Sequence, residues 1–167
     1  MFFTADNHFN HTNMIMHENR PFNCVEEMNE IMIDKWNKKV GRKDSIYIVG
    51  DFIWSNPDKI IPRLNGKKHL IKGNHDKQIK QHYFEWVKDY YELKYNNTIV
   101  VLSHYPIFRW NRSHYGSYHF YGHVHSNKSS NDFMSGLGNA YNVGVDVNNY
   151  EPVAIEEIIK KLDKVLK

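Results

Sequence analysis

Short apolar runs alternate with longer amphipathic segments along the chain. The apolar runs are rich in β-branched and aromatic residues, which is typical of buried strands. They predict strands at 1–5, 45–49, 69–72, 98–102, 117–121 and 141–147. The amphipathic or capped segments predict helices at 23–40, 57–64, 77–88 and at the C-terminus. Strands separated by helices indicate an α/β layered fold.

Two of the predicted helices carry specific signals. Asn23 is a typical N-cap residue and Glu26 follows three positions later, a capping-box pattern that opens the helix at 23–40. No repeat, low-complexity tract or linker interrupts the 167 residues, so we expect a single domain spanning 1–167. The C-terminal helix is predicted from apolar residues at helical spacing, namely Ile155, Ile158, Ile159, Leu162 and Leu166.

Composition excludes several classes of protein. Cys24 is the only cysteine, so the chain forms no internal disulfide and no thiolate metal cage. The first residues lack the basic start of a secretory signal, and no apolar run approaches the roughly 20 residues that span a bilayer. We therefore expect a cytoplasmic protein without a membrane partner. The formal charge of +3 and the mixing of Lys with Glu argue against a stable nucleic-acid complex.

Polar side chains cluster directly after five of the predicted strands. The clusters are Asp-Asn-His at 6–8, Gly-Asp at 50–51, Gly-Asn-His-Asp at 73–76, Ser-His at 103–104 and Gly-His-Val-His at 122–125. Ligands of open α/β sheets bind outside the carboxyl ends of the strands, so we expect the clusters to converge on one crevice. Any one cluster is compatible with a turn or a surface histidine. Their shared position after strands predicts a catalytic metal site.

The clusters contain more metal-binding side chains than one ion needs. Two aspartates, one asparagine and four histidines exceed the ligands of a tetrahedral ion and suit two divalent cations that share a carboxylate. Asp51 is the natural bridge, because a carboxylate has two oxygens to share. Oxygen and imidazole ligands without sulfur are compatible with Mn, Fe, Zn or Ni. The candidate ligands are Asp6, His8, Asp51, Asn74, His104, His123 and His125.

The order of these motifs resembles the calcineurin-like metallophosphoesterase superfamily, in particular its small single-domain bacterial and phage members. The resemblance covers residues 6–125. It implies an α/β fold in which two mixed β-sheets form a four-layer sandwich flanked by helices. It also implies that Asp6, His8 and His125 hold the first metal, that Asn74, His104 and His123 hold the second, and that Asp51 bridges both.

The same resemblance implies roles for the remaining residues of the Gly-Asn-His-Asp motif. His75 would protonate the leaving oxygen of a phosphate ester, and Asp76 would orient the His75 ring. A metal-bound hydroxide would attack phosphorus. The chain departs from the commonest family pattern where 52–55, Phe-Ile-Trp-Ser, follows the bridging Asp51. His11 is an additional histidine near the first metal, which we interpret as a surface or packing residue in preference to a substrate contact.

The expected substrate is small and nucleotide-like. The segment 108–116 combines aromatic residues with Arg109 and Arg112, which suit a base and a phosphate, although a packed loop explains the same residues equally well. Arg20, in the loop after the first ligands, is a third phosphate-binding candidate. Asp146, near the end of the chain, is interpreted as structural.

We therefore predict a metal-dependent phosphoric ester hydrolase, with a phosphodiesterase favoured over a phosphomonoesterase. Two alternatives stay open at this point: a non-catalytic metal-binding scaffold of the same fold, and a nuclease. A scaffold is expected to lose ligands, whereas every expected position is filled. A nuclease needs an extended basic groove, which the near-balanced charge disfavours. The sequence carries no signal for an oligomeric state.

Overall fold

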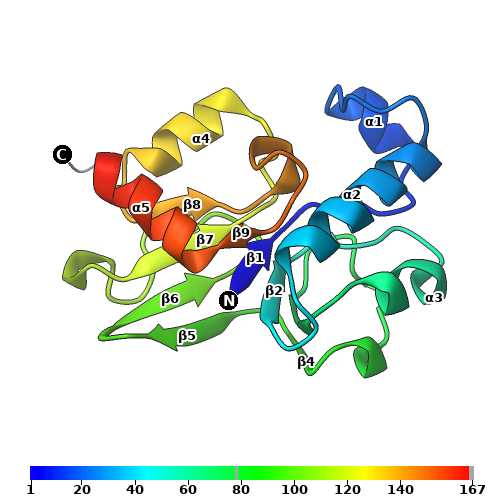
Figure 1. Ribbon diagram of the computed structural model, residues 1–167. Helices are drawn as coiled ribbons and strands as arrows, with labels where there is room; N and C mark the ends of the chain where they lie inside the picture. Colours follow the sequence, from blue (N-terminus) through cyan, green and yellow to red (C-terminus); the bar gives the residue numbers. More distant parts are fainter. Residues whose placement is uncertain (78, 166–167) are drawn as a thin grey trace.

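Two β-sheets form the centre of the molecule in the computed structural model, which describes residues 1–77 and 79–165 (Figure 1). The first sheet has the strand order β4-β3-β2-β1-β9 and the second has the order β5-β6-β7-β8. The strands are β1 (Phe2–Thr4), β2 (Ser45–Val49), β3 (Lys67–Ile71), β4 (Trp86–Lys88), β5 (Tyr91–Tyr95), β6 (Thr98–Leu102), β7 (Tyr118–Tyr121), β8 (Ala140–Asn142) and β9 (Val153–Ala154). The helices are α1 (Asn13–His17), α2 (Val25–Lys39), α3 (Pro57–Ile60), α4 (Lys128–Ser135) and α5 (Ile155–Val165).

Both sheets are mixed, and in each the strands that precede polar clusters are parallel. Strands β1 to β4 pair in parallel and β9 adds to β1 in the antiparallel direction. In the second sheet β6, β7 and β8 are parallel and β5 is antiparallel to β6. The carboxyl ends of parallel strands meet at one edge of a sheet. The fold is therefore the predicted α/β arrangement of two mixed sheets flanked by helices.

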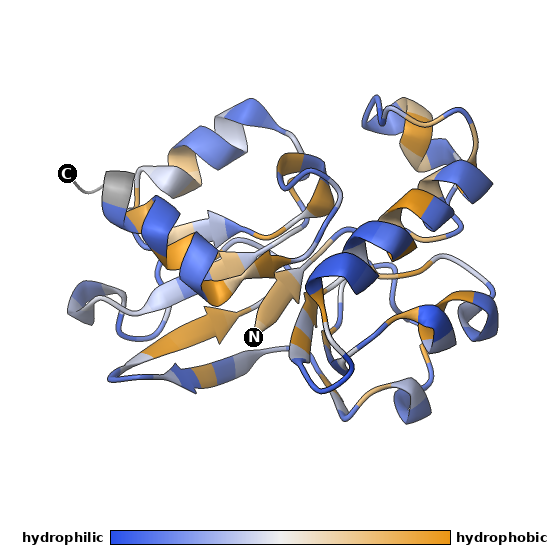
Figure 2. Ribbon diagram, viewed as in Figure 1, coloured by the Kyte–Doolittle hydropathy of each residue, from blue (hydrophilic) through white to orange (hydrophobic). Residues whose placement is uncertain are grey.

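Successive side chains along a strand point to opposite faces of its sheet, and each face packs against a different layer of the molecule. Ile46 and Ile48 of β2 pack into the core cluster that contains the inner face of α2, while Tyr47 and Val49 pack between the sheets. The residues of β6 alternate likewise: Val101 faces the outer cluster that contains Met134 of α4. Figure 1 shows α2 and α3 beside the first sheet and α4 and α5 beside the second. Figure 2 shows the apolar strands β1 and β6 and the two-sided character of α2 and α5.

The long helix α2 begins two residues later than its predicted N-cap. Cys24 occupies the cap position, and Asn23 donates hydrogen bonds from its backbone and side chain to the carboxylate of Glu27, at 2.6 and 2.9 Å. The reciprocal partner is thus Glu27 and not Glu26. The buried face of the helix includes Met28 and Trp36 (0% and 1% exposed), so side-chain packing accounts for most of its stability.

The predicted helix at 77–88 is wrong. The structure has a short 3₁₀ turn at Gln81–Tyr83 and then β4, whose Trp86 pairs with His69 of β3. Phe84 is buried against the helical side of the first sheet, so the apolar residues of this segment serve an edge strand and a core contact. The segment predicted as a strand at 141–147 is strand only at its start, because Val145–Val147 is a 3₁₀ turn.

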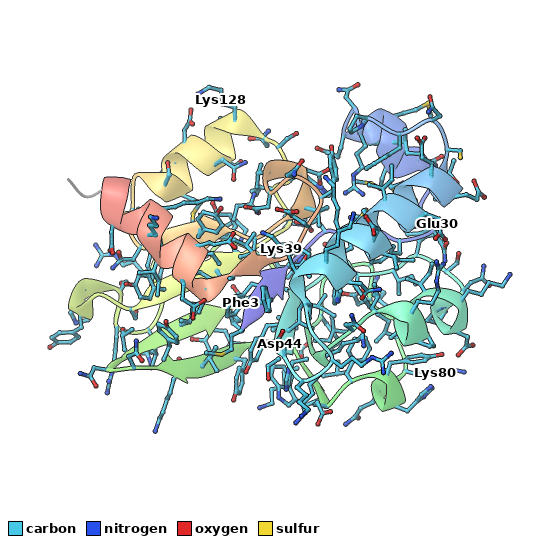
Figure 3. All side chains as sticks on the ribbon, in the orientation of Figure 1. Phe3, Glu30, Lys39, Asp44, Lys80 and Lys128 are labelled. Carbon is cyan, nitrogen blue, oxygen red and sulfur yellow. The ribbon has the colours of Figure 1, made fainter. Side chains whose placement is uncertain are left out.

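Four short elements were not predicted, namely α1, β5, α4 and β9. The C-terminal helix is confirmed: Ile155, Ile158 and Leu162 are buried, while Leu166 lies outside the described residues. Figure 3 shows the side chains on this frame, with Phe3 in the interior and Glu30 and Lys128 on the surface. In the part of the chain that the structure describes, no helix is long and apolar enough to cross a membrane.

Candidate metal centre

The two sheets bring the five polar clusters to one place. The first three clusters follow β1, β2 and β3 of the first sheet, and the last two follow β6 and β7 of the second. Backbone hydrogen bonds join these segments directly: Asp6 donates to the carbonyl of Gly50, and Gly122 donates to the carbonyl of His104, both at 3.0 Å. The side chains therefore converge where the carboxyl ends of both sheets meet, as expected.

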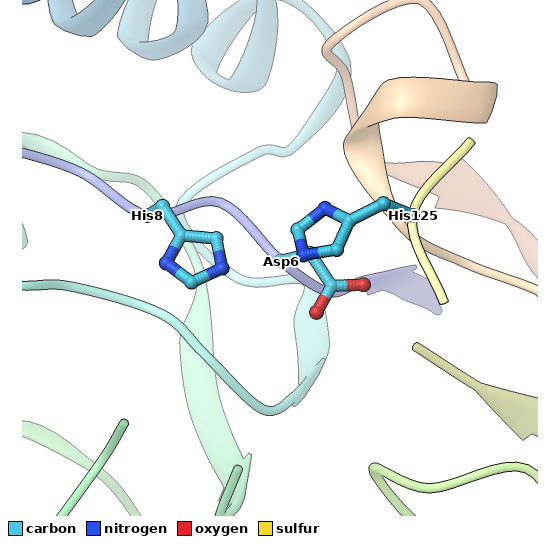
Figure 4. Close-up of side chains that lie close together, drawn as sticks. All are labelled: Asp6, His8 and His125. Atoms are coloured by element: carbon cyan, nitrogen blue, oxygen red, sulfur yellow. The ribbon is translucent and has the colours of Figure 1, made fainter. Parts of the chain in front are cut away.

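The first ligand group consists of Asp6, His8 and His125. One ligand atom from each lies within 4.8 Å of the others, close enough to bind one ion. Figure 4 shows the imidazole of His125 beside the Asp6 carboxylate, with the His8 ring across from it. The three residues are the set that the motif order assigned to one metal.

The second ligand group consists of Asp51, His104 and His123, whose ligand atoms also lie within 4.8 Å of one another. The side-chain oxygen of Asn74 lies 3.1 Å from Nε2 of His104, so the amide borders the same group. Asp51 Oδ2 lies 3.4 Å from His104 Nε2 and 3.7 Å from His8 Nε2. Asp51 thus stands between the two groups, where a shared carboxylate would have to be.

Hydrogen bonds from outside the centre direct two of the histidines. Nδ1 of His104 lies 2.9 Å from the carbonyl oxygen of Val49 and therefore carries the proton, which leaves Nε2 free to bind an ion. Nδ1 of His125 lies 2.7 Å from Oδ2 of Asp146. Metal-binding histidines are commonly oriented by such a bond on the second ring nitrogen.

The donor set fits a divalent cation. His8 Nε2 is buried and, among the described residues, has no hydrogen-bond partner. A buried polar atom without a partner costs on the order of 1–3 kcal/mol, so its presence calls for a ligand. Two carboxylates and four imidazoles are oxygen and nitrogen donors that Mn, Fe, Zn and Ni accept. These residues therefore fit the divalent metal use expected from the sequence.

The backbone at the centre is strained in a consistent way. Five candidate ligands, namely Asp6, His8, Asp51, His123 and His125, have φ between 45° and 69°, a region that residues other than glycine rarely adopt. Neighbouring glycines allow the segments to approach closely. A Cβ atom on Gly73 would lie 2.1 Å from Oδ1 of Asp51, and one on Gly122 would lie 2.6 Å from Cβ of Ala5. Strain of this kind persists only where surrounding contacts hold it.

Burial and neighbouring charges shift the pKa values of the ligands. Full burial raises the pKa of Asp6 to about 6, although His125 and His104 lie nearby. Burial lowers the pKa of His8 to about 2, against the attraction of the Asp51 carboxylate. Burial also disfavours the charge of Asp51, but the hydrogen bond and charge of His104 outweigh it and bring this pKa to about 2. A neutral His8 and an ionised Asp51 are the forms that bind cations.

Arg20, which we expected to contact the substrate, lies in the interior of the molecule. Arg20 is buried (3% exposed), and its guanidinium donates to the carboxylate of Asp146 at 2.8 and 3.0 Å. It also donates to the backbone carbonyls of Asp6 and Asn7, at 2.7 and 2.9 Å. Arg20 therefore holds the segment that carries the first ligands. A loop arginine looks the same in sequence whether it is buried or exposed, so only the structure separates the two roles.

Asp146, which we interpreted as structural from the sequence, contacts a candidate ligand in the structure. It lies in the 3₁₀ turn Val145–Val147, paired with Arg20 and bonded to His125 as described above. Its carboxylate orients a candidate ligand while the charge of Arg20 helps to keep it ionised; these interactions lower its pKa although burial opposes ionisation. No motif surrounds Asp146, and 126 positions separate it from Arg20, so the sequence contained no local signal.

Asp76 does not orient the His75 ring. The buried Asp76 carboxylate accepts backbone hydrogen bonds from Asp51 and Gly73 at 2.8 Å and from Phe52 at 3.0 Å. Among the described residues, no side-chain hydrogen bond joins Asp76 to His75. Its hydrogen bonds instead join the turn after β3 to the turn after β2. Through them Asp76 positions Asp51, the candidate bridging ligand.

His75 lies at the rim of the centre, with its side chain 40% exposed. Its Nε2 is 3.9 Å from Asp51 Oδ2, and its backbone N–H donates to Asp51 Oδ1 at 2.9 Å. His11 also reaches the centre, because its Nδ1 lies 3.3 Å from Nδ1 of His8. The ring of His11 stacks on Trp54, with centroids 4.0 Å apart and planes at 8°, so the packing role expected for His11 is observed.

Arg112 lies at the opposite end of the second sheet from the ligands. It borders a cavity with Asn97 and Thr98, at the start of β6, whereas His104 follows the end of that strand. This position does not support the expected substrate contact, and a contact by Arg112 stays a prediction. Its left-handed φ of 58° marks the tight turn that opens the 3₁₀ segment Ser113–Tyr115.

The aromatic loop that carries Arg109 is packed. Trp110 is buried in the outer core, and its Nε1 donates to the carbonyl of Ser117 at 3.0 Å. The Phe108 ring stacks on Phe133 of α4 at 6.0 Å, and the guanidinium of Arg109 lies over Phe108. Within the described residues no hydrogen bond or ion pair joins Arg109 to the ligand groups. The packed-loop alternative describes this segment, and a substrate contact by Arg109 stays a prediction.

Fold and site agree with the expectation from the sequence. Two mixed sheets meet at ligand groups that follow the strand ends in the motif order described above, as the resemblance to the calcineurin-like metallophosphoesterases implied. Yfce, a phosphoesterase from E. coli, shares 16% identity and a TM-score of 0.43, with 86% of this chain and 76% of that chain covered. A likeness of such low identity and TM-score shows neither a family nor an activity for this chain.

The comparisons also place the chain among nearer relatives. No protein-family model matches it. The chain belongs to the same family as the uncharacterized protein MJ1445 of Methanocaldococcus jannaschii, which is 34% identical over 170 residues that cover 98% of this chain and 92% of that protein. The crystal structure of AQ665 from Aquifex aeolicus, a protein of unknown function, has a TM-score of 0.80 at 27% identity, with 96% of this chain and 98% of that chain covered.

Proposed function

We propose that this protein hydrolyses phosphate esters at a centre of two divalent cations, and that its substrates are phosphodiesters. The position of Asp51 Oδ2 carries the proposal, because it lies 3.7 Å from a histidine of the first ligand group and 3.4 Å from a histidine of the second. A carboxylate of the second group that also approaches the first group is an arrangement that suits a pair of ions.

Seven candidate ligands would hold the two cations. Asp6, His8 and His125 would hold one cation, and His104, His123 and Asn74 the other, with Asp51 shared. Such cations supply a lowered pKa for water and neutralise charge on phosphoryl oxygens. Four of these ligands, Asp6, His8, Asp51 and His104, are buried, and their separation from bulk water strengthens the electrostatic interactions.

His75 supplies the proton that the reaction needs. Hydrolysis forms a bond from a water oxygen to phosphorus and breaks the ester bond, so the departing oxygen must gain a proton unless it is a stable anion. His75 is exposed at the rim and its Nε2 is 3.9 Å from Asp51 Oδ2, which supports a contact between its ring and a phosphate held at the centre. Proton donation by a positioned histidine typically contributes about 10²–10⁴ in rate.

Two adjoining cavities beside the centre favour a diester over a monoester. One, of about 570 Å³, borders His104 and Tyr105, and the other, of about 640 Å³, borders Trp54 and His75. Asn74 and Lys77 border both cavities. A diester carries a substituent on each side of phosphorus and can use both spaces, whereas a monoester needs only one.

The proposal is tested by hydrolysis of bis-p-nitrophenyl phosphate and p-nitrophenyl phosphate by chelator-stripped protein that is titrated with Mn²⁺. We expect activity that requires the metal and a higher kcat/KM for the diester. A preference for the monoester would overturn the diester assignment. Absence of turnover with Mn²⁺, Fe²⁺, Zn²⁺ and Ni²⁺ would overturn the proposed function and favour a metal-binding scaffold.

A further inference from the structure

An exposed tryptophan stands beside the proposed proton donor. Trp54 is 53% exposed, and its ring lies 5.3 Å from the ring of His75. It belongs to the segment that follows the bridging Asp51, where the chain departs from the commonest family pattern. A large apolar side chain that is exposed next to a reaction centre is a candidate for ligand contact.

The backbone around Trp54 is held firmly in place. Trp54 donates its backbone N–H to the carbonyl of Phe9 at 2.9 Å, and Asn10 donates from its side chain to the carbonyl of Ser55 at 2.6 Å. The ring is held as well, because the stacked His11 ring covers one indole face. Trp54 is therefore an ordered aromatic surface whose free side is open to a ligand. A surface ordered in advance binds with a smaller entropic loss.

The cavity on this side of the centre has the size and charge of a nucleoside phosphate site. Its volume of about 640 Å³ lies within the range of about 300–1,000 Å³ that is usual for small-molecule sites. Trp54 and His75 border it together with two lysines, Lys77 and Lys80. Figure 3 labels Lys80 near the surface of the molecule. The one acidic residue on its border, Asp58, accepts a hydrogen bond from the hydroxyl of Tyr83.

We propose that Trp54 is the stacking platform for the base of a nucleoside whose phosphate binds at the metal centre. The inference rests on the proposed function and deepens it by naming the substrate class. Because Trp54 lies on the His75 side, the stacked nucleoside is the leaving group: the ester bond from phosphorus to its oxygen breaks, and this oxygen receives the proton of His75. Lys77 and Lys80 supply positive charge for the phosphate oxygens.

The test compares two ligands that differ by a base. Adenosine 5′-monophosphate and ribose 5-phosphate are titrated by calorimetry into protein loaded with Mn²⁺, and the ratio of their dissociation constants measures the contribution of the base. Stacking of a base on an aromatic side chain is worth about 1–3 kcal/mol, so we expect the dissociation constant of ribose 5-phosphate to exceed that of adenosine 5′-monophosphate by at least about fivefold. Where the protein hydrolyses either compound, the ratio of kcat/KM values replaces the ratio of affinities.

Three variants separate stacking from other effects. Trp54→Ala should reduce the ratio of the two dissociation constants to near one. Trp54→Phe keeps an aromatic face and should retain most of the preference for the ligand that carries a base. Tyr115→Ala removes another exposed aromatic residue (78% exposed) that lies beside Arg112 at the far end of β6, so this variant should keep the ratio of the parent protein. Near-native circular dichroism of Trp54→Ala serves as the folding control, and Trp54→Phe keeps the test informative if that variant is unstable.

The outcomes distinguish failure of this inference from failure of the proposed function. Hydrolysis of bis-p-nitrophenyl phosphate together with a ratio near one in the parent protein would overturn the stacking role and leave the esterase intact. A ratio of at least about fivefold that depends on Trp54, in a protein that hydrolyses no ester, would support the nucleoside site and overturn the proposed function. A ratio that is unchanged in Trp54→Ala would assign base recognition to other residues and overturn the proposal.

Discussion

At the scale of single residues, His75 is the side chain whose chemistry is most directly testable. His75→Ala should retain both cations, because the seven candidate ligands remain, and should lower kcat by about 10²–10⁴ for esters with poor leaving groups. An ester of p-nitrophenol should lose much less, since its leaving oxygen departs as a stable anion. Steady-state kinetics on a methyl and a nitrophenyl diester check this difference. Equal losses on both would remove His75 from the role of proton donor.

Asp51 is predicted to serve both ligand groups. In Asp51→Asn the side chain keeps one acceptor oxygen but loses its charge, so we expect both cations to bind more weakly, with occupancy well below two equivalents after dialysis. Elemental analysis of the dialysed protein measures this. Asp34→Asn, which changes an exposed aspartate of α2, is the matched control and should keep full occupancy. Two full equivalents in Asp51→Asn would contradict the bridging assignment.

Asp146 is predicted to act through His125. Loss of a carboxylate that orients a metal-binding histidine typically costs about 10–100-fold in metal affinity, and we expect Asp146→Asn to show a loss of this size. The effect should fall on one of the two binding events in a calorimetric titration with Mn²⁺, because Asp146 contacts a ligand of the first group alone. If both events weakened equally, or neither did, the positioning role would have to be abandoned.

At the scale of elements, the buried His119 of β7 links the two segments that carry His104 and His123. Its Nδ1 lies 3.2 Å from the carbonyl oxygen of Val101, and its Nε2 accepts the backbone N–H of Ile107 at 3.0 Å. Both contacts require a neutral ring with its proton on Nδ1, and burial lowers the pKa of His119 to about 4.

This pKa predicts a pH dependence of stability. Between about pH 6.5 and pH 4 the unfolded state binds a proton at this position and the folded state does not, so the free energy of unfolding falls as the pH falls, by up to about 3 kcal/mol. His119→Gln should flatten this part of the profile in urea unfolding, while substitution of the exposed His17 by Gln should leave it unchanged. A slope that persists in His119→Gln would trace to other groups.

Elements differed in how well their sequences predicted them. The strands at 45–49 and 98–102 were predicted with their observed bounds, because buried central strands are continuous β-branched runs. The segment 77–88 is polar with scattered aromatic residues, and its strand exists because β3 offers an edge to pair with. Helix α4 was missed because Phe133 and Met134 are its only large apolar residues, and Met134 alone is buried.

At the scale of the whole molecule, cation binding is predicted to stabilise the fold. The ligands come from five segments far apart in sequence and meet only in the folded state, so cations bind the native state in preference to the unfolded chain. At a free Mn²⁺ concentration of 100 times Kd the gain is about 2.7 kcal/mol, or about 5–10 °C in Tm for a protein of this size. Calorimetric scans in the presence of Mn²⁺ and in the presence of a chelator measure this difference in Tm. A known metalloprotein, scanned in the same way, serves as the positive control. If the Tm of the control depends on the metal but the Tm of this protein does not, the prediction is contradicted.

The sequence by itself determined the α/β class and the identity of the candidate ligands. Hydrophobic periodicity specifies which face of a strand is buried, and a polar residue directly after a buried strand must lie at the edge of a sheet. The tertiary structure decided the roles that depend on burial and on contacts between distant segments. Arg20 and Asp76 proved to be internal hydrogen-bonding residues, and Asp146 came to orient His125. Burial and long-range pairing are properties of the folded chain, because they arise only when separate segments of the sequence are brought together.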